Sequence, residues 1–243
     1  MANPPFNQKD WRAENELIDD PRWRGYDVPP KSNANYGWIL NMASKLSENG
    51  VAGFILANGA LSGSGEEYKI RRKLIENNLV EAILVLPRNM FYTTDISVTL
   101  WILNKNKKAQ EKSVGKEKRK YRNREKEILF MDLRQMGEPF EKKYTQFAET
   151  DITKVAKTYH QWQQKKIENV PEYCYSASFE EVKAKDFSLV PSKYIEFINR
   201  DENVDFDEKM TALKNDFSLL LKEEEKSKKE LLKVFKELGY EIK

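Results

Sequence analysis

The segment Asn3-Pro4-Pro5-Phe6 combines an amide, two prolines and an aromatic ring. The Asn3 side-chain oxygen and a backbone carbonyl, that of Pro4, can accept hydrogen bonds from the two N–H groups of one exocyclic amine. The prolines fix φ near about −65° and add no competing donor. Two such acceptors would favour a pyramidal amine nitrogen with its lone pair aimed at a methyl donor, and Phe6 offers a face on which an extruded base can stack. The segment predicts activation of a purine amine by positioning and electrostatics, without a covalent enzyme intermediate.

A proline-rich turn near a chain end is the competing interpretation of this tetrapeptide. From average residue usage, the four letters should occur by chance in roughly one in a thousand chains of this size. That rarity does not decide between the two interpretations, so the surrounding sequence has to.

Three other features could carry chemistry, and each has a simpler explanation. His160 lies in the polar stretch TYHQWQQKK with no Asp, Cys or His cluster around it, so we expect a surface histidine and no metal site. Cys174 has no activating partner nearby in sequence and is expected to be structural. The loop 63–65 lacks the third glycine of a dinucleotide fingerprint, which favours a helix-entry loop.

The elements that must hold these residues are typical of an α/β protein. Short apolar runs predict buried strands and apolar spacings of three and four predict helices, while residues 7–35 are polar and contain several prolines, which predicts a long loop. The expected strands are 51–57, 80–86, 96–103 and 127–132, and the expected helices are 36–49, 66–77, 151–168 and 178–186.

The connection between the second and third strands, residues 87–95, has nine residues and no helical pattern. A parallel crossover needs about a dozen residues or more, so these two strands should be antiparallel. We expect this reversal at the edge of an otherwise parallel sheet.

The tail, residues 206–238, places apolar residues at helical spacing, with a polar interruption at 223–230. An unbroken helix of this length would reach about 50 Å. The sequence leaves open one long helix or two that fold back on each other. Such a stripe is most often a packing surface, within the chain or against a partner helix.

Charge is distributed unevenly. Residues 105–126 contain eleven Lys or Arg and three Glu, whereas the whole chain has a net charge of +3. A basic segment on an acidic body suits a polyanion contact, and a solvated hairpin loop is the alternative. The 33% charged residues, the mean hydropathy of −0.76, the absence of a long apolar run and the single cysteine predict a soluble cytoplasmic protein.

Four segments together resemble one protein family. ANPPFN, YDVPPKSNANYGWI, FILANGALSGSGEEYKIRRKLIE and EAILVLPRNMFYTTDISVTLWIL follow one another over most of residues 2–135. In this order they are similar to the modification (methyltransferase) subunit of type I restriction–modification systems. The likeness from about residue 150 onward is much less specific.

The resemblance implies S-adenosylmethionine-dependent methyl transfer to adenine N6. It implies DNA with a flipped adenine, a specificity subunit and a restriction subunit as partners, and a class I (Rossmann-like) methyltransferase sheet with an antiparallel strand. The segment 3–6, that is Asn3, Pro4, Pro5 and Phe6, matches the family's catalytic motif. Phe91 and Tyr92 match the segment whose aromatic residue packs beside the flipped adenine, and ordinary core packing is the alternative for both.

The family's glycine-rich cofactor motif precedes the catalytic motif, and these 243 residues do not contain it. We therefore expect residues 1–150 to form the target-base half of a catalytic domain, and residues 151–243 a helical, partner-docking region. On this interpretation the chain is inactive alone and does not bind S-adenosylmethionine. The alternatives are a non-catalytic module that binds DNA or the specificity subunit, and a split enzyme whose other half lies on a second polypeptide.

Overall fold

The computed structural model describes residues 1–115, 117–198 and 205–240. Its chain divides into two compact units, residues 1–197 and residues 198–243. The first unit contains the sheet and all the candidate residues, and the second contains one helix.

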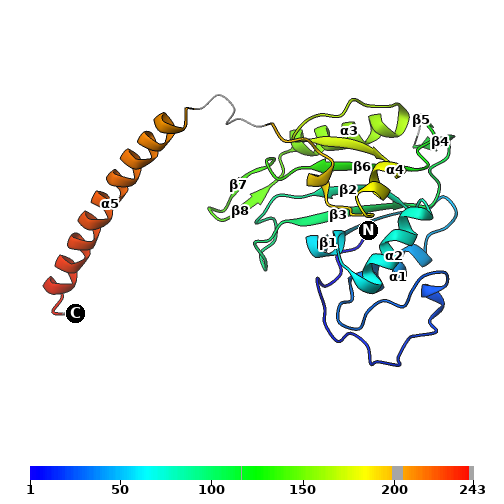
Figure 1. Ribbon diagram of the computed structural model, residues 1–243, viewed down its shortest axis with the longest axis horizontal. Helices are drawn as coiled ribbons and strands as arrows, with labels where there is room; N and C mark the ends of the chain where they lie inside the picture. Colours follow the sequence, from blue (N-terminus) through cyan, green and yellow to red (C-terminus); the bar gives the residue numbers. More distant parts are fainter. Residues whose placement is uncertain (116, 199–204, 241–243) are drawn as a thin grey trace. The chain divides into compact units, whose positions relative to one another are not determined.

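The first unit is built on a five-stranded sheet of order β1-β3-β2-β6-β9 (Figure 1). The strands β2 and β6 are parallel, β3 is antiparallel to both β1 and β2, and β9 is antiparallel to β6. Strands β1, β2 and β6 therefore share one direction. Their bounds are β1 Val51–Ala57, β2 Val80–Val85, β3 Val98–Asn104, β6 Glu127–Asp132 and β9 Cys174–Ser178.

The predicted α/β class and the antiparallel pairing of β2 and β3 are confirmed, but the predicted position of the reversal is wrong. Strand β3 lies between β1 and β2 and not at an edge. The crossover through α2 (Gly65–Glu76) returns the chain two strand positions away from β1, and β3 fills the vacant place. The sequence also failed to predict β9, whose five residues CYSAS include no β-branched or large aliphatic side chain, and which pairs with β6.

Helices cover both faces of the sheet, so that β2 is buried at every position. On one face α1 (Asn35–Ser44), α2 and α4 (Phe179–Ala184) pack around Phe54 and Trp101. On the other face α3 (Glu149–Gln164) contributes Trp162 to a cluster with Leu84 and Met131. The expected helices all exist, with ends that differ by one to five residues.

The expected long loop before α1 is confirmed, and its aromatic residues hold it in place. Trp23 is 3% exposed, lies in the short 3₁₀ helix η1 (Pro21–Trp23) and meets Trp11 edge to face. The Trp11 indole N–H donates to the Pro30 carbonyl at 2.8 Å. Two other 3₁₀ helices are η2 (Asn58–Leu61) and η3 (Pro191–Lys193).

Two hairpins extend from opposite ends of the sheet (Figure 1). Hairpin β4–β5 (Gln110–Val114 and Glu117–Tyr121) follows the end of β3, which lies beside the start of β1. Hairpin β7–β8 (Glu138–Phe140 and Tyr144–Gln146) follows the end of β6. Because β3 runs against β1, β2 and β6, the two hairpins are separated by the full length of the strands, about 20 Å for seven residues.

The second unit contains the helix α5 (Phe206–Glu237), which is unbroken over 32 residues. Of the two arrangements that the sequence left open, the single long helix is the one found. None of its residues is buried, and Leu213, Phe217 and Leu220 are each more than half exposed. Among the described residues, no helix is both long and apolar enough to cross a membrane.

Candidate functional site

The predicted catalytic segment leaves the sheet beside β1. The backbone of Ala2 pairs with β1 in parallel: its N–H donates to the Gly53 carbonyl at 3.0 Å, and its carbonyl accepts from the Ile55 N–H at 3.2 Å. The following residues, 3–6, therefore run towards the carboxyl end of β1. In open α/β sheets this end of the strands is where ligands bind.

Phe6 meets Phe91, which comes from the loop after β2. The two ring centroids are 6.2 Å apart with an interplanar angle of 89°, an edge-to-face contact. Both rings pack against the apolar cluster on the α3 face, in which Leu84 and Ile55 also take part. The structure thus brings together two segments that lie 85 residues apart in the sequence and that the resemblance places in one site.

The two proposed acceptors are unoccupied by protein donors. The Asn3 side chain is exposed, and within the described part of the chain neither its amide oxygen nor the Pro4 carbonyl receives a hydrogen bond. Both atoms lie on the segment that carries Phe6.

Tyr92 lies apart from this contact. Its side chain is 70% exposed and meets Tyr144 of hairpin β7–β8, with ring centroids 4.7 Å apart. The two tyrosines line an open cavity of about 350 Å³, together with Phe91, Asp95 and Lys143. Of the two aromatic residues singled out from the sequence, Phe91 lies against Phe6 of the predicted catalytic segment and Tyr92 lies against the hairpin.

Downstream of Phe6 the chain is tied to the first turn of α1. The Asn7 N–H donates to the Asn35 side-chain oxygen at 3.0 Å, and the Asn35 amide donates to the Asn7 side-chain oxygen at 2.8 Å. The Gln8 carbonyl accepts from the Ala34 N–H at 2.9 Å. Asn35 stands in a segment that carried the family resemblance, but sequence reasoning assigned it no role.

The loop Gly63–Gly65 does not fit a cofactor cradle, which agrees with the predicted helix-entry loop. Gly65 begins α2, and a side-chain carbon at Gly63 would collide with the Glu67 carboxylate, which fills the space over that glycine. The Gly63 carbonyl accepts from the Arg71 guanidinium at 2.7 Å. These contacts fill the space over Gly63.

The basic segment 105–126 is divided between structural and exposed cations. Lys107 is 2% exposed and donates to the carbonyls of Val80 and Glu127, and burial lowers the pKa of its amine to about 7. Arg124 is 1% exposed and pairs with the buried Glu81 at 3.3 Å. Lys118 and Lys120 of the hairpin are exposed, at the end of the sheet opposite to Phe6 and Phe91.

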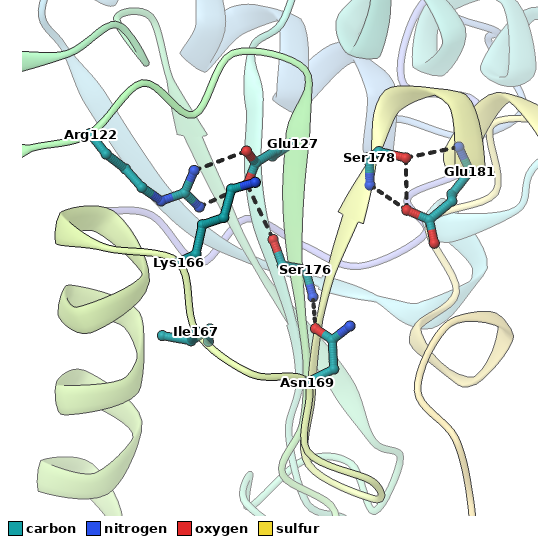
Figure 2. Close-up of a pocket in the computed structure, with 8 residues that line it drawn as sticks. All are labelled: Arg122, Glu127, Lys166, Ile167, Asn169, Ser176, Ser178 and Glu181. Atoms are coloured by element: carbon teal, nitrogen blue, oxygen red, sulfur yellow. Dashed lines mark hydrogen bonds and ion pairs between the residues drawn. The ribbon is translucent and has the colours of Figure 1, made fainter.

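A polar cavity of about 230 Å³ lies where β6 begins and β9 ends (Figure 2). Its carboxylates are already engaged. Glu127 pairs with Arg122 at 2.7 Å, and Glu181 accepts from the backbone N–H and the hydroxyl of Ser178, both at 2.7 Å. The cavity lies at the amino end of β6, so it is separate from residues 3–6. The residues that line it are Arg122, Glu127, Lys166, Ile167, Asn169, Ser176, Ser178 and Glu181.

Cys174 is buried, as expected of a structural cysteine, whereas His160, which was expected at the surface, is half-buried. Cys174 is a free, buried thiol on β9, and desolvation raises its pKa, which disfavours the reactive thiolate. His160 is half-buried on α3, and its Nδ1 lies 3.2 Å from the Gln163 side-chain oxygen. The described residues contain no cluster of three His, Cys, Asp or Glu side chains that could hold a metal ion.

Comparisons with known proteins agree with this geometry. The family model described as N-6 DNA Methylase matches residues 1–203. The type I restriction enzyme HindI methylase subunit of Haemophilus influenzae is 40% identical over 99% of this chain and 51% of its own length. The MjaIX methylase subunit of Methanocaldococcus jannaschii is 32% identical over 99% of this chain and 42% of its own length.

A solved structure supports the same assignment. The methyltransferase subunit of a type I restriction–modification system from Streptococcus thermophilus superposes with a TM-score of 0.67 and 27% identity, over 81% of this chain and 37% of that one. The chain thus spans about half the length, or less, of the relatives that it matches. On the match over residues 1–203, the chain belongs to the N-6 DNA methylase family.

Proposed function

We propose that this chain provides the target-base side of an adenine-N6 DNA methyltransferase of a type I restriction–modification system. The observation that carries this proposal is the arrangement of residues 3–6 and Phe91. Two free acceptors, the Asn3 amide oxygen and the Pro4 carbonyl, lie on the segment whose Phe6 meets Phe91 at the carboxyl end of the strands.

In the proposed mechanism the flipped adenine lies against the Phe6 ring, and Phe91 holds that ring in place from its edge. The N6 amine donates one hydrogen to the Asn3 oxygen and the other to the Pro4 carbonyl. Both acceptors draw the nitrogen towards a pyramidal geometry and fix the direction of its lone pair, as preorganised dipoles do at other active sites. S-adenosylmethionine supplies the methyl group in this family. We assign no step to Tyr92, because its ring faces hairpin β7–β8.

The cofactor would be held outside the residues described here. Gly63–Gly65 does not fit it, and the relatives are about twice as long as this chain. We therefore infer that residues 1–150 act with a cofactor-binding half, as part of a longer protein or as a second polypeptide. This chain alone would then neither bind S-adenosylmethionine nor transfer methyl groups, and calorimetric titration with the cofactor tests that inference. Micromolar affinity would refute it.

Partners follow from the same assignment. The H. influenzae relative bears the name of a type I restriction enzyme subunit, which suggests a complex of modification, specificity and restriction subunits acting on DNA in the cytoplasm. Within that complex the target sequence would be chosen by the specificity subunit.

The proposal is tested with a fusion enzyme in which this chain replaces the matching half of the H. influenzae relative, assayed with the relative's specificity subunit. Asn3→Ala should lower methyl transfer by at least about 100-fold, because it removes one of the two acceptors. DNA affinity should be unchanged. The matched control is Asn15→Ala, which replaces an exposed asparagine of the loop before α1. Weaker DNA binding with unchanged turnover would contradict the role of Asn3.

A second candidate function rests on α5. Its exposed apolar residues leave a 32-residue amphipathic helix without a buried face in the described structure, which favours a helical binding partner. We infer that residues 151–243 contribute a docking element for the specificity subunit. Capture of this chain by that subunit should be lost when residues 206–243 are deleted. Equal capture of the full and shortened chains would exclude the helix as the docking element.

A further inference from the structure

The catalytic segment ends at a residue with an unusual backbone conformation. Asn7 has φ +50°, in the left-handed region that residues other than glycine seldom adopt. Asparagine tolerates this region better than most residues because its short side chain can form local hydrogen bonds. Contacts with other residues are nevertheless needed to keep Asn7 in this conformation.

Asn35 supplies that hold through two reciprocal hydrogen bonds. Its side-chain oxygen accepts from the Asn7 N–H at 3.0 Å, and its amide donates to the Asn7 side-chain oxygen at 2.8 Å. The Asn33 amide reaches the same Asn7 oxygen at 3.5 Å, and the Asn33 oxygen accepts the Asn35 N–H at 3.0 Å. Asn35 itself is 0% exposed, so water cannot replace these partners.

The element that carries Asn35 is rigidly placed. Asn35 is the first residue of α1, whose next residue, Tyr36, is fully buried and donates its hydroxyl to the Ala60 carbonyl at 2.6 Å. Ile39 and Leu40 anchor the same helix in the core. The position of the Asn35 amide is therefore set by the core and not by the loop that it contacts.

Helix capping does not explain Asn35. The N-cap position of α1 is Ala34, which makes no side-chain cap hydrogen bond, and the Asn35 side chain is directed to Asn7 and not to the free N–H groups of the helix. Because the buried Asn35 amide bonds to Asn7 and not to its own helix, it fixes the position of the segment that contains Asn7.

We propose that Asn35 is a positioning residue for the purine-amine site. The pairing of Ala2 with β1 fixes the start of the catalytic segment, and the Asn7–Asn35 pair fixes its end. Between these two anchors Asn3 and Pro4 make no hydrogen bonds within the described structure, so the anchors set the direction of their acceptor atoms. This inference deepens the proposed function and rests on it.

Amide exchange in the 243-residue chain tests the contact itself. Asn35→Ala should speed hydrogen exchange of the Asn7 amide by about tenfold, since one hydrogen bond is lost, while core amides such as that of Ile39 keep their protection. The matched control is Asn41→Ala, on the same helix, where the side chain accepts from Arg22. Unchanged exchange at Asn7 would overturn the proposal, as would equal effects of the two variants.

The fusion enzyme tests what the contact does. Asn35→Ala should lower kcat about 10- to 100-fold, because the acceptor atoms of Asn3 and Pro4 would no longer be held in place. KM for DNA should change less than about twofold. Asn7→Ala leaves α1 intact and should lower kcat by a similar factor. It tests the same contact if the Asn35→Ala variant does not fold. In the double variant the losses should not add, because both substitutions break one pair.

Additive losses, or a rise of KM with unchanged kcat, would overturn the positioning role. An inactive fusion enzyme without substitutions would count against the proposed function, while the exchange data on the chain itself would still decide whether Asn35 holds Asn7.

Discussion

Replacing Glu81 by glutamine removes the counter-charge of Arg124 without changing the size of the side chain. Glu81 on β2 is 0% exposed, and Arg124, just before β6, is 1% exposed, with 3.3 Å between Nε and Oε1. The Gln163 amide of α3 donates to the same carboxylate oxygen at 3.0 Å. This network joins hairpin β4–β5 and α3 to the centre of the sheet.

The size of the effect follows from burial and distance. At 3.3 Å and an effective dielectric constant of about 20, two unit charges attract by about 5 kcal/mol. Removing one member of a buried pair typically costs about 3–5 kcal/mol, because the other charge is left without a partner. We expect Glu81→Gln to lower the free energy of unfolding by that amount. Removing both charges, with Glu81→Leu and Arg124→Met, should cost less than Glu81→Leu alone.

Urea unfolding of the chain, followed by far-ultraviolet circular dichroism, measures these differences. The matched control is Glu76→Gln, which breaks an i,i+4 pair with Arg72 on the surface of α2 and should leave the midpoint unchanged. A loss below about 1 kcal/mol for Glu81→Gln would show that the buried Arg124 charge does not depend on Glu81. So would a double variant whose loss equals the sum of the two single losses.

Three further outcomes are expected. Burial lowers the pKa of Lys107 to about 7, below its value of 10.5 in the unfolded chain. Between these two pH values the unfolded state binds more protons than the folded state, so the free energy of unfolding should rise with pH from about 7 to about 10. In urea titrations at several pH values, Lys107→Met should flatten that rise. Parallel stability–pH curves for the variant and the wild type would contradict this. In single-turnover assays of the fusion enzyme, Phe91→Ala should lower the rate of methyl transfer, whereas Tyr92→Ala should have a much smaller effect. A larger loss for Tyr92→Ala than for Phe91→Ala would show that Tyr92 and not Phe91 supports the adenine site. The double substitution Lys118→Ala and Lys120→Ala changes hairpin β4–β5, at the far end of the sheet. It should leave the single-turnover rate of methyl transfer unchanged. A tenfold loss of that rate would indicate that DNA contacts this hairpin.

Local patterns in the sequence were sufficient for much of the fold. The apolar runs located β1, β2, β3 and β6, because strands buried on both faces are continuous hydrophobic segments. The short connection 87–95 identified the antiparallel pair β2–β3. Neither signal states which strand lies next to which, so the central position of β3 and the pairing of β9 with β6 were missed.

The candidate site was predictable to the extent that it lies within short motifs. Residues 3–6 and Phe91 were both singled out, and the structure places Phe6 and Phe91 in contact. Asn35 was not assigned a role, because its contact with Asn7 spans 28 residues and joins two polar residues that leave no periodic signal. Only the folded chain shows that this asparagine is buried.

The basic segment illustrates a different limit. Counting charges treats all eleven cations alike. In the structure Lys107 and Arg124 are buried and Arg122 pairs with Glu127, so three of them stabilise the fold and are not available to a polyanion. Charge becomes informative about a partner only when the exposure of each side chain is known.

A structure of the fusion enzyme bound to DNA that contains its target adenine would show which groups hold the N6 amine. We expect an extruded adenine whose N6 lies within about 3.2 Å of both the Asn3 side-chain oxygen and the Pro4 carbonyl, with its ring on Phe6. An adenine amine held by other residues, with Asn3 turned to solvent, would contradict this expectation.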